Sequence, residues 1–267
     1  MNKLSLLAVF AMILAPGAID PLPTLAQNTG TRQPQCNPPN PVNGFSRCNY
    51  GEGFSYYGFF ENGSPNGVGT LLIGGARYDG NFVNGFPQGE GRLVLADDSR
   101  YEGIFNQGSI VEGAAFFSNG DRYEGTFTQI GRTEQITTTV RVGTTLDGEP
   151  RLGEAQIERT FFSSQPDGGD GRYIFANGNR FEGEFFAGEP LGLGTFFHTT
   201  GTVCSGYFFT RNFDGRSCIC TYRNGDRYEG ELRQGRPHGT GTMIKADGTR
   251  ISGAFRDGQP VSFSGYN

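Results

Sequence analysis

A short aromatic motif recurs along the chain at nearly constant spacing, and this repeat limits the possible folds more than any other feature. The clear copies are Tyr56-Tyr57-Gly58, Tyr78-Asp79-Gly80, Tyr101-Glu102-Gly103, Tyr123-Glu124-Gly125, Phe181-Glu182-Gly183 and Tyr228-Glu229-Gly230. Cys204-Ser205-Gly206 and Ile251-Ser252-Gly253 stand in the same phase. Successive copies start 22, 23, 22, 58, 23, 24 and 23 residues apart, so one insertion of about 35 residues interrupts eight copies.

Each copy is interpreted as a β-hairpin. Residues one, three and five share one face of a strand, because side chains alternate with a period of two. A polar loop such as residues 83–88 follows, and a second strand starts at a Gly-x-Gly pair such as Gly89 and Gly91. One hairpin is marginal in water, so neighbouring hairpins must stack and bury a continuous row. The predicted core of this row is Tyr78, Phe82, Tyr101, Phe105, Tyr123, Phe127, Phe181, Phe185, Tyr228 and Leu232.

The composition supports an all-β fold. The chain has 267 residues, of which 44 are Gly, 24 are Phe and 11 are Tyr. Glycine destabilises helix interiors, so this content excludes a helical bundle, and the aromatic content argues against disorder. No strict three-residue glycine period exists, which excludes collagen. The prediction is therefore an elongated, twisted array of antiparallel β-hairpins with about eight repeats and one inserted hairpin.

The seventh copy, residues 228–250, carries the complete pattern YEGELRQGRPHGTGTMIKADGTR. It resembles the MORN (membrane occupation and recognition nexus) repeat, and the resemblance extends from about Tyr56 to the end, apart from the insertion. The resemblance implies a twisted antiparallel array of hairpins that serves as a scaffold and binds proteins or membranes, without shared catalytic residues. The third, sixth and eighth copies depart from the pattern; the sixth carries cysteine at three positions of the buried face.

The insertion, about residues 128–166, has strand character of its own. Residues 136–142 and 154–162 are predicted strands, and residues 146–150 form a turn signal between them. We expect a longer hairpin. Because this segment is unique in a repetitive chain, it is a candidate for partner specificity.

The N-terminus has the pattern of an export signal. Lys3 precedes an apolar run over residues 4–15, and a small-residue cleavage site ends at residue 26. The predicted domains are a signal peptide over 1–26, a Pro-rich linker and N-terminal cap over 27–55, and the repeat array over 56–267. The expected location is the periplasm, the cell envelope or the exterior. The alternative is that the segment is retained as an N-terminal anchor.

Export to an oxidising compartment makes the five cysteines disulfide candidates. Cys36 and Cys48 form one group. Cys204, Cys218 and Cys220 form another on one face of the sixth hairpin, where cross-strand geometry favours a Cys204–Cys220 bond over Cys204–Cys218. Cys218 is then the free thiol. A metal site or redox pair is the alternative reading, but no fourth ligand is obvious, so no metal is predicted.

A second set of apolar residues falls on the opposite face of the second strands. Its members are Leu72, Val94, Phe116, Ile174, Phe197 and Ile244. If this face is open, they form an apolar stripe that binds a partner. The alternative is that the sheet curls or packs its terminal segments over them.

Catalytic patterns are absent from the sequence. His238 lies where the MORN pattern has His, and His198 takes an inward aromatic position, so both are expected to be structural. The Gly-x-Gly pairs lead into strands, which excludes a dinucleotide fingerprint. The net charge of −5 argues against nucleic-acid binding. We expect a non-catalytic exported scaffold without a cofactor that binds another protein; the alternative is a binder of envelope lipid or polysaccharide through exposed aromatic and apolar residues.

Overall fold

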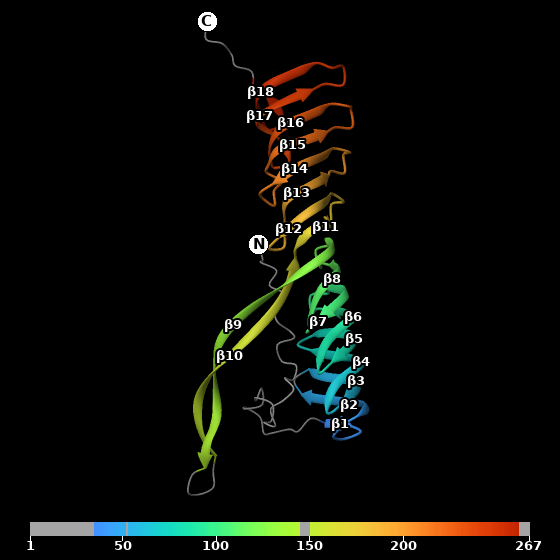
Figure 1. Ribbon diagram of the computed structural model, residues 1–267, viewed down its shortest axis with the longest axis vertical. Helices are drawn as coiled ribbons and strands as arrows, with labels where there is room; N and C mark the ends of the chain where they lie inside the picture. Colours follow the sequence, from blue (N-terminus) through green and yellow to red (C-terminus); the bar gives the residue numbers. More distant parts are fainter. Residues whose placement is uncertain (1–34, 52, 145–149, 262–267) are drawn as a thin grey trace. The chain divides into compact units, whose positions relative to one another are not determined.

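The chain folds into antiparallel strands. In the computed structural model the backbone is described for residues 35–51, 53–144 and 150–261, and the side chains for the same residues except 129–163. The strands are β1 (Gln35–Asn37), β2 (Gly44–Gly51), β3 (Phe54–Glu61), β4 (Ser64–Ile73), β5 (Ala76–Val83), β6 (Phe86–Val94), β7 (Arg100–Asn106), β8 (Ser109–Phe116), β9 (Arg122–Thr144), β10 (Pro150–Pro166), β11 (Gly168–Ile174), β12 (Arg180–Phe186), β13 (Glu189–Phe197), β14 (Val203–Phe208), β15 (Gly215–Thr221), β16 (Arg227–Arg233), β17 (Arg236–Ile244), β18 (Arg250–Arg256) and β19 (Gln259–Pro260) (Figure 1). Helices are absent from these residues, which confirms the all-β prediction.

The 19 strands belong to one open antiparallel sheet. Most strands pair with their neighbours in the sequence, as expected for stacked hairpins. The contacts divide the chain into two compact units. Unit 1 comprises Met1–Val111 with Gln129–Ser164, and unit 2 comprises Glu112–Thr128 with Gln165–Asn267.

The turns inside the hairpins are shorter than predicted. In place of a loop over residues 83–88, β5 ends at Val83 and β6 begins at Phe86. Asn84 and Gly85 between them have φ angles of 49° and 84°. Two successive positive φ angles are typical of a type I′ turn, whose twist matches that of the flanking strands. The second strand therefore begins three residues before the Gly-x-Gly pair.

The aromatic row forms the core of each unit. Tyr78 in unit 1 and Tyr228 in unit 2 are 1% and 0% exposed. The ring of Tyr78 meets the ring of Phe105 in the next hairpin edge-on, with 5.0 Å between centroids. The Tyr228 hydroxyl donates to the Glu231 carbonyl oxygen at 2.9 Å, which satisfies its polar end inside the core.

Paired glycines make room for these rings. Gly230 and Gly241 face each other across β16 and β17. A Cβ atom on Gly241 would lie 2.5 Å from Cζ and 2.6 Å from Cε2 of Tyr228. The tyrosine ring thus lies directly on the backbone of its own hairpin, and only glycine permits this approach.

The insertion is one long hairpin of β9 and β10, which pair with each other (green and yellow in Figure 1). The expected strands over 136–142 and 154–162 lie within them, and the predicted turn lies largely outside the described residues. The first residues of β9 still pair with β11, with Tyr123 opposite Tyr173. The insertion therefore leaves the fourth repeat hairpin intact.

Candidate functional site

The cysteines lie where disulfide bonds link adjacent strands. Cys36 bonds to Cys48 between β1 and β2, and Cys204 bonds to Cys220 between β14 and β15. Cys218 is a buried free thiol. A Cβ atom on Gly206 would lie 2.5 Å from Cys218 Sγ, so this sulfur fills space that a tyrosine ring fills in other copies. Burial raises the pKa of the Cys218 thiol to about 11, which keeps it protonated.

The predicted apolar stripe is partly covered. Leu72 is 41% exposed, whereas Val94, Phe116, Ile174, Phe197 and Ile244 are only half-buried. Arginines of the neighbouring strands lie beside them: the guanidinium carbon of Arg180 is 4.1 Å from the ring centre of Phe197. The prediction did not take these arginines into account, although they precede six of the eight motifs.

Five of these six arginines form an ion pair with the acidic residue two positions later, whereas Arg250 has Ser252 there. Arg180 Nε lies 3.0 Å from Glu182 Oε1, and Arg227 Nη2 lies 2.9 Å from Glu229 Oε1. These side chains are partly exposed, so each pair adds at most about 1 kcal/mol of stability. This ladder of ion pairs is a solvated surface.

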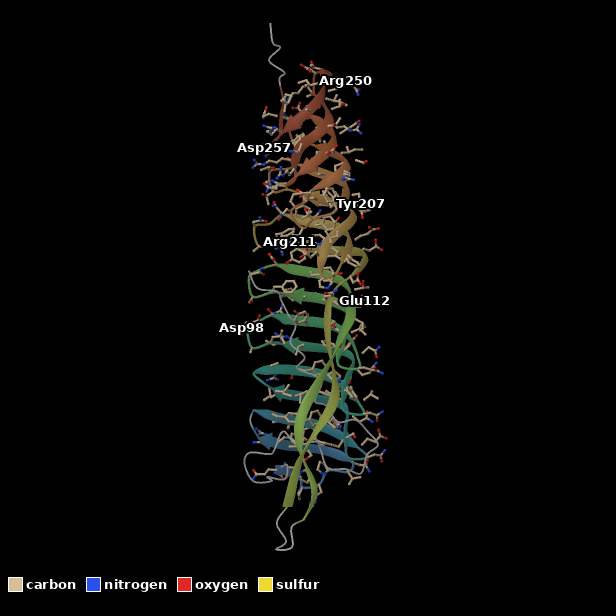
Figure 2. All side chains as sticks on the ribbon, turned by 90° about the vertical axis from the view of Figure 1, so that its left-hand side faces the viewer. Asp98, Glu112, Tyr207, Arg211, Arg250 and Asp257 are labelled. Carbon is tan, nitrogen blue, oxygen red and sulfur yellow. A yellow bond between two sulfur atoms is a disulfide. The ribbon has the colours of Figure 1, made fainter. Side chains whose placement is uncertain are left out.

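Other apolar residues are more exposed than most of those in the stripe. They lie on the first strands of the hairpins and beside the glycine pairs. In unit 1, Phe45, Tyr57 and Phe59 are 44–52% exposed, and the ring of Phe45 contacts those of the other two, with centroids 4.6 and 5.3 Å away. In unit 2, Phe186, Leu193, Tyr207 and Phe209 are 45–69% exposed. We call these four the C-terminal apolar patch; Tyr207 is labelled in Figure 2.

The C-terminal apolar patch borders a groove of about 510 Å³. Leu193 lies opposite Tyr207 in the register of β13 and β14, so their side chains share a face. Glu184 lies at the groove, and its Oε2 accepts a hydrogen bond from the Leu193 amide at 2.7 Å. This patch was not identified from the sequence. A comparison of the copies carries the signal: the sixth copy has Tyr207 and the fifth has Leu193 at positions where the seventh has the polar residues Glu231 and Thr240.

A larger groove of about 980 Å³ lies on the inner face of unit 2. Its walls include polar residues of the turns, among them His198, Thr200 and Asn224, and the half-buried rings of Phe175 and Phe196 form part of its floor. Arg211, labelled in Figure 2, also lines it. The volume is in the range of small-molecule sites.

The two histidines differ in environment. His198 is exposed, and its Nδ1 lies 2.7 Å from Thr200 Oγ1. The expectation that it packs as an inward aromatic is wrong, because it follows the last residue of β13 and lies in the turn, where its ring meets that of Phe196 edge-on at 6.2 Å. His238 is half-buried, and its carbonyl oxygen accepts a hydrogen bond from the Tyr228 hydroxyl at 3.3 Å.

The described residues contain no cluster of three or more His, Cys, Asp or Glu side chains suited to a metal ion. Among these same residues, no helix has the length and apolar character needed to cross a bilayer. The predicted signal peptide lies outside them.

Comparison with known families agrees with the hairpin pattern. The family model described as MORN repeat matches residues 56–73, 78–100, 181–203 and 228–250. No curated protein matches the chain. The four matched segments coincide with the hairpins β3–β4, β5–β6, β12–β13 and β16–β17. MORN repeats suggest a module that interacts with proteins or associates with membranes. The chain therefore contains MORN repeats.

Proposed function

We propose that this protein is an exported, non-catalytic scaffold of the cell envelope, periplasm or exterior that binds another protein through the C-terminal apolar patch. The observation that carries the proposal is the exposure of Phe186, Tyr207 and Phe209 along one groove, with the exposed Leu193 opposite Tyr207. Contiguous exposed apolar side chains are typical of protein interaction sites. Aromatic anchors also contribute most to binding energy at such sites.

Two further observations support this function. The two disulfides are compatible with an oxidising compartment outside the cytosol. The patch also has a rigid backbone, because Leu193 and Tyr207 project from paired strands rather than from a loop. The partner would offer an apolar segment to the groove, bordered by donors that can reach the carboxylate of Glu184.

The test compares a patch variant with a matched control. Leu193→Ser with Tyr207→Ser removes two apolar groups from opposed positions of β13 and β14. Thr240→Ser with Ala254→Ser alters the equivalent opposed pair of β17 and β18. Both variants and the wild type are used to capture proteins from native envelope extract. Loss of a specific partner only in the patch variant supports the proposal.

Two outcomes count against it. If the patch variant loses thermal stability but keeps its partners, the patch is structural. A variant lacking residues 129–165 tests the insertion in the same experiment: if it loses the partner while the patch variant keeps it, recognition belongs to the inserted hairpin. Mass spectrometry of the exported protein checks the predicted cleavage after residue 26.

A further inference from the structure

One position near the end of the second strands changes character along the chain. This position lies two residues after the buried residue of each second strand. In unit 1, where the buried residues are Leu71 and Leu93, it holds Ile73 and Leu95. The last three second strands of unit 2 have His198, Tyr222 and Lys245 in this position. Of these three, Lys245 forms an ion pair with Asp226 at 2.8 Å, which accounts for its charge.

His198 and Tyr222 line the inner groove of about 980 Å³, and Lys245 binds Asp226, which also lines it. Beside His198, the Thr200 hydroxyl lies 2.7 Å from the imidazole Nδ1 and 3.4 Å from the Thr202 hydroxyl. Hydroxyls can donate and accept, so this chain can be extended by a ligand that does the same. Burial raises the pKa of Tyr222 to about 12, which keeps its hydroxyl a donor at neutral pH.

Arg223 adds a positive charge to the lining of the inner groove. Its side chain lies along the neighbouring turn, because a Cβ atom on Gly201 would lie 3.5–3.7 Å from its Cβ, Cδ and Cγ atoms. Within the described ranges, Arg223 has no ion-pair partner. Arg211, also in the lining, is 3.5 Å from Glu189.

The carboxylate in the lining is already neutralised. Asp226 accepts hydrogen bonds from Lys245 Nζ at 2.8 Å and from the Ala246 amide at 3.0 Å. The groove of a chain with net charge −5 therefore presents an unpaired guanidinium next to hydroxyls and amides. Guanidinium binds carboxylates in a bidentate manner, so an anionic ligand is complementary to Arg223.

The groove offers side chains but little free backbone. The Gly201 amide donates to the His198 carbonyl at 2.8 Å, and the Tyr222 amide donates to the Asp226 carbonyl at 2.9 Å. A peptide that binds by strand addition needs unpaired backbone groups. A sugar instead hydrogen-bonds to side chains, and its C–H groups suit the negative faces of rings such as Phe196.

We propose that the inner groove of unit 2 binds a short anionic oligosaccharide, with Arg223 holding a carboxylate and the His198–Thr202 turn holding ring hydroxyls. This site is independent of the C-terminal apolar patch and of the proposed protein partner. It makes the protein a candidate receptor for acidic envelope or extracellular polysaccharide.

The test is calorimetric titration of the full chain at roughly 0.15 M ionic strength, where long-range charge effects are screened. The probes are the trimer of galacturonic acid, its neutral methyl ester and a hexaglutamate peptide. The acid trimer should bind at least about tenfold more tightly than the ester, because one charge-assisted contact is lost. Arg223→Gln should weaken binding of the acid trimer by about tenfold.

Arg233→Gln is the control, since it removes the same charge from an exposed position next to the buried Leu232. It should change the affinity less than about twofold. Thr200→Val should weaken the ester and the acid alike, because it removes one hydroxyl contact. The proposal is overturned if the trimer shows no saturable binding, if the ester binds as tightly, or if both arginine variants act equally. Tighter binding of hexaglutamate would make this a peptide site.

Discussion

The closest contact in the fold provides the sharpest test of the hairpin architecture. Gly241→Ala places a methyl group 2.5–2.6 Å from two ring carbons of Tyr228. Ordinary carbon contacts are about 3.5–4.0 Å, so the ring must move by roughly 1 Å. Overpacking of this kind costs about 1–3 kcal/mol, and loss of the Tyr228 hydrogen bond to Glu231 adds about 1 kcal/mol. We expect a total loss of about 2–4 kcal/mol in the free energy of unfolding.

Gly169→Ala is the matched control. Gly169 lies in β11 of the same unit, and nothing approaches its added Cβ atom within 4 Å. Alanine restricts the unfolded chain more than glycine, so this variant should be neutral or stabilised by up to about 1 kcal/mol. Urea unfolding followed by far-UV circular dichroism measures both variants.

A double-mutant cycle identifies the cause. Tyr228→Ala alone should cost about 3–5 kcal/mol, because it leaves a cavity in the core. Without the ring, Gly241→Ala should add little, giving a coupling of about 1–3 kcal/mol between the two positions. Additive losses, or equal effects of Gly241→Ala and Gly169→Ala, would refute the explanation of the glycine pairs. The sixth copy already combines a missing ring with a larger residue, Cys218, at the matching position.

Three further predictions concern titration and thiols. Hydrogen bonds from Lys245 and its neighbours hold the pKa of Asp226 below its usual range, so its contribution to stability is present above about pH 4 and is lost as the pH falls through the folded value. Asp226→Asn should therefore lower the melting temperature at pH 7, and this difference should shrink in acid. Cys218 should resist iodoacetamide at pH 8 in the folded protein and react in urea, because burial keeps it protonated; rapid labelling of the native protein would contradict this. Replacing Cys204 and Cys220 by Ala should cost about 3 kcal/mol, since the bond closes a loop with a sequence separation of 16. Calorimetry of this variant and the wild type, both with the Cys36–Cys48 bond oxidised, measures the loss.

The sequence was informative where the physics is local. The spacing of Tyr78, Gly80 and Phe82 places them on one strand face, and the structure buries both aromatic rings there. The phase of the sixth copy also placed Cys204 opposite Cys220, as the register of β14 and β15 has it. The length of the turn was predicted less well. Asn84 and Gly85 close the hairpin in two residues, where the polar segment suggested a longer loop.

The surface depends on contacts between hairpins. Phe116 and Phe197 belong to the expected stripe, yet arginines of adjacent strands lie over them. The guanidinium carbon of Arg122, on the following strand, is 4.9 Å from the ring centre of Phe116, and that of Arg180, on the preceding strand, is 4.1 Å from that of Phe197. The alternation of side chains along one strand assigns a residue to a face. It does not tell which side chain of a neighbouring strand covers that residue.

By itself, the sequence determined the all-β hairpin repeat, its buried aromatic row and its interruption. These follow from a period of two and from the steric demand for glycine beneath a ring, and both act within a few residues. Only the tertiary structure decided which outer residues are exposed, as at Leu193 and Tyr207, and that a groove opens beside His198 and Arg223. The reason is physical: exposure and cavities arise from the register and twist between neighbouring hairpins, which no single copy of the repeat contains.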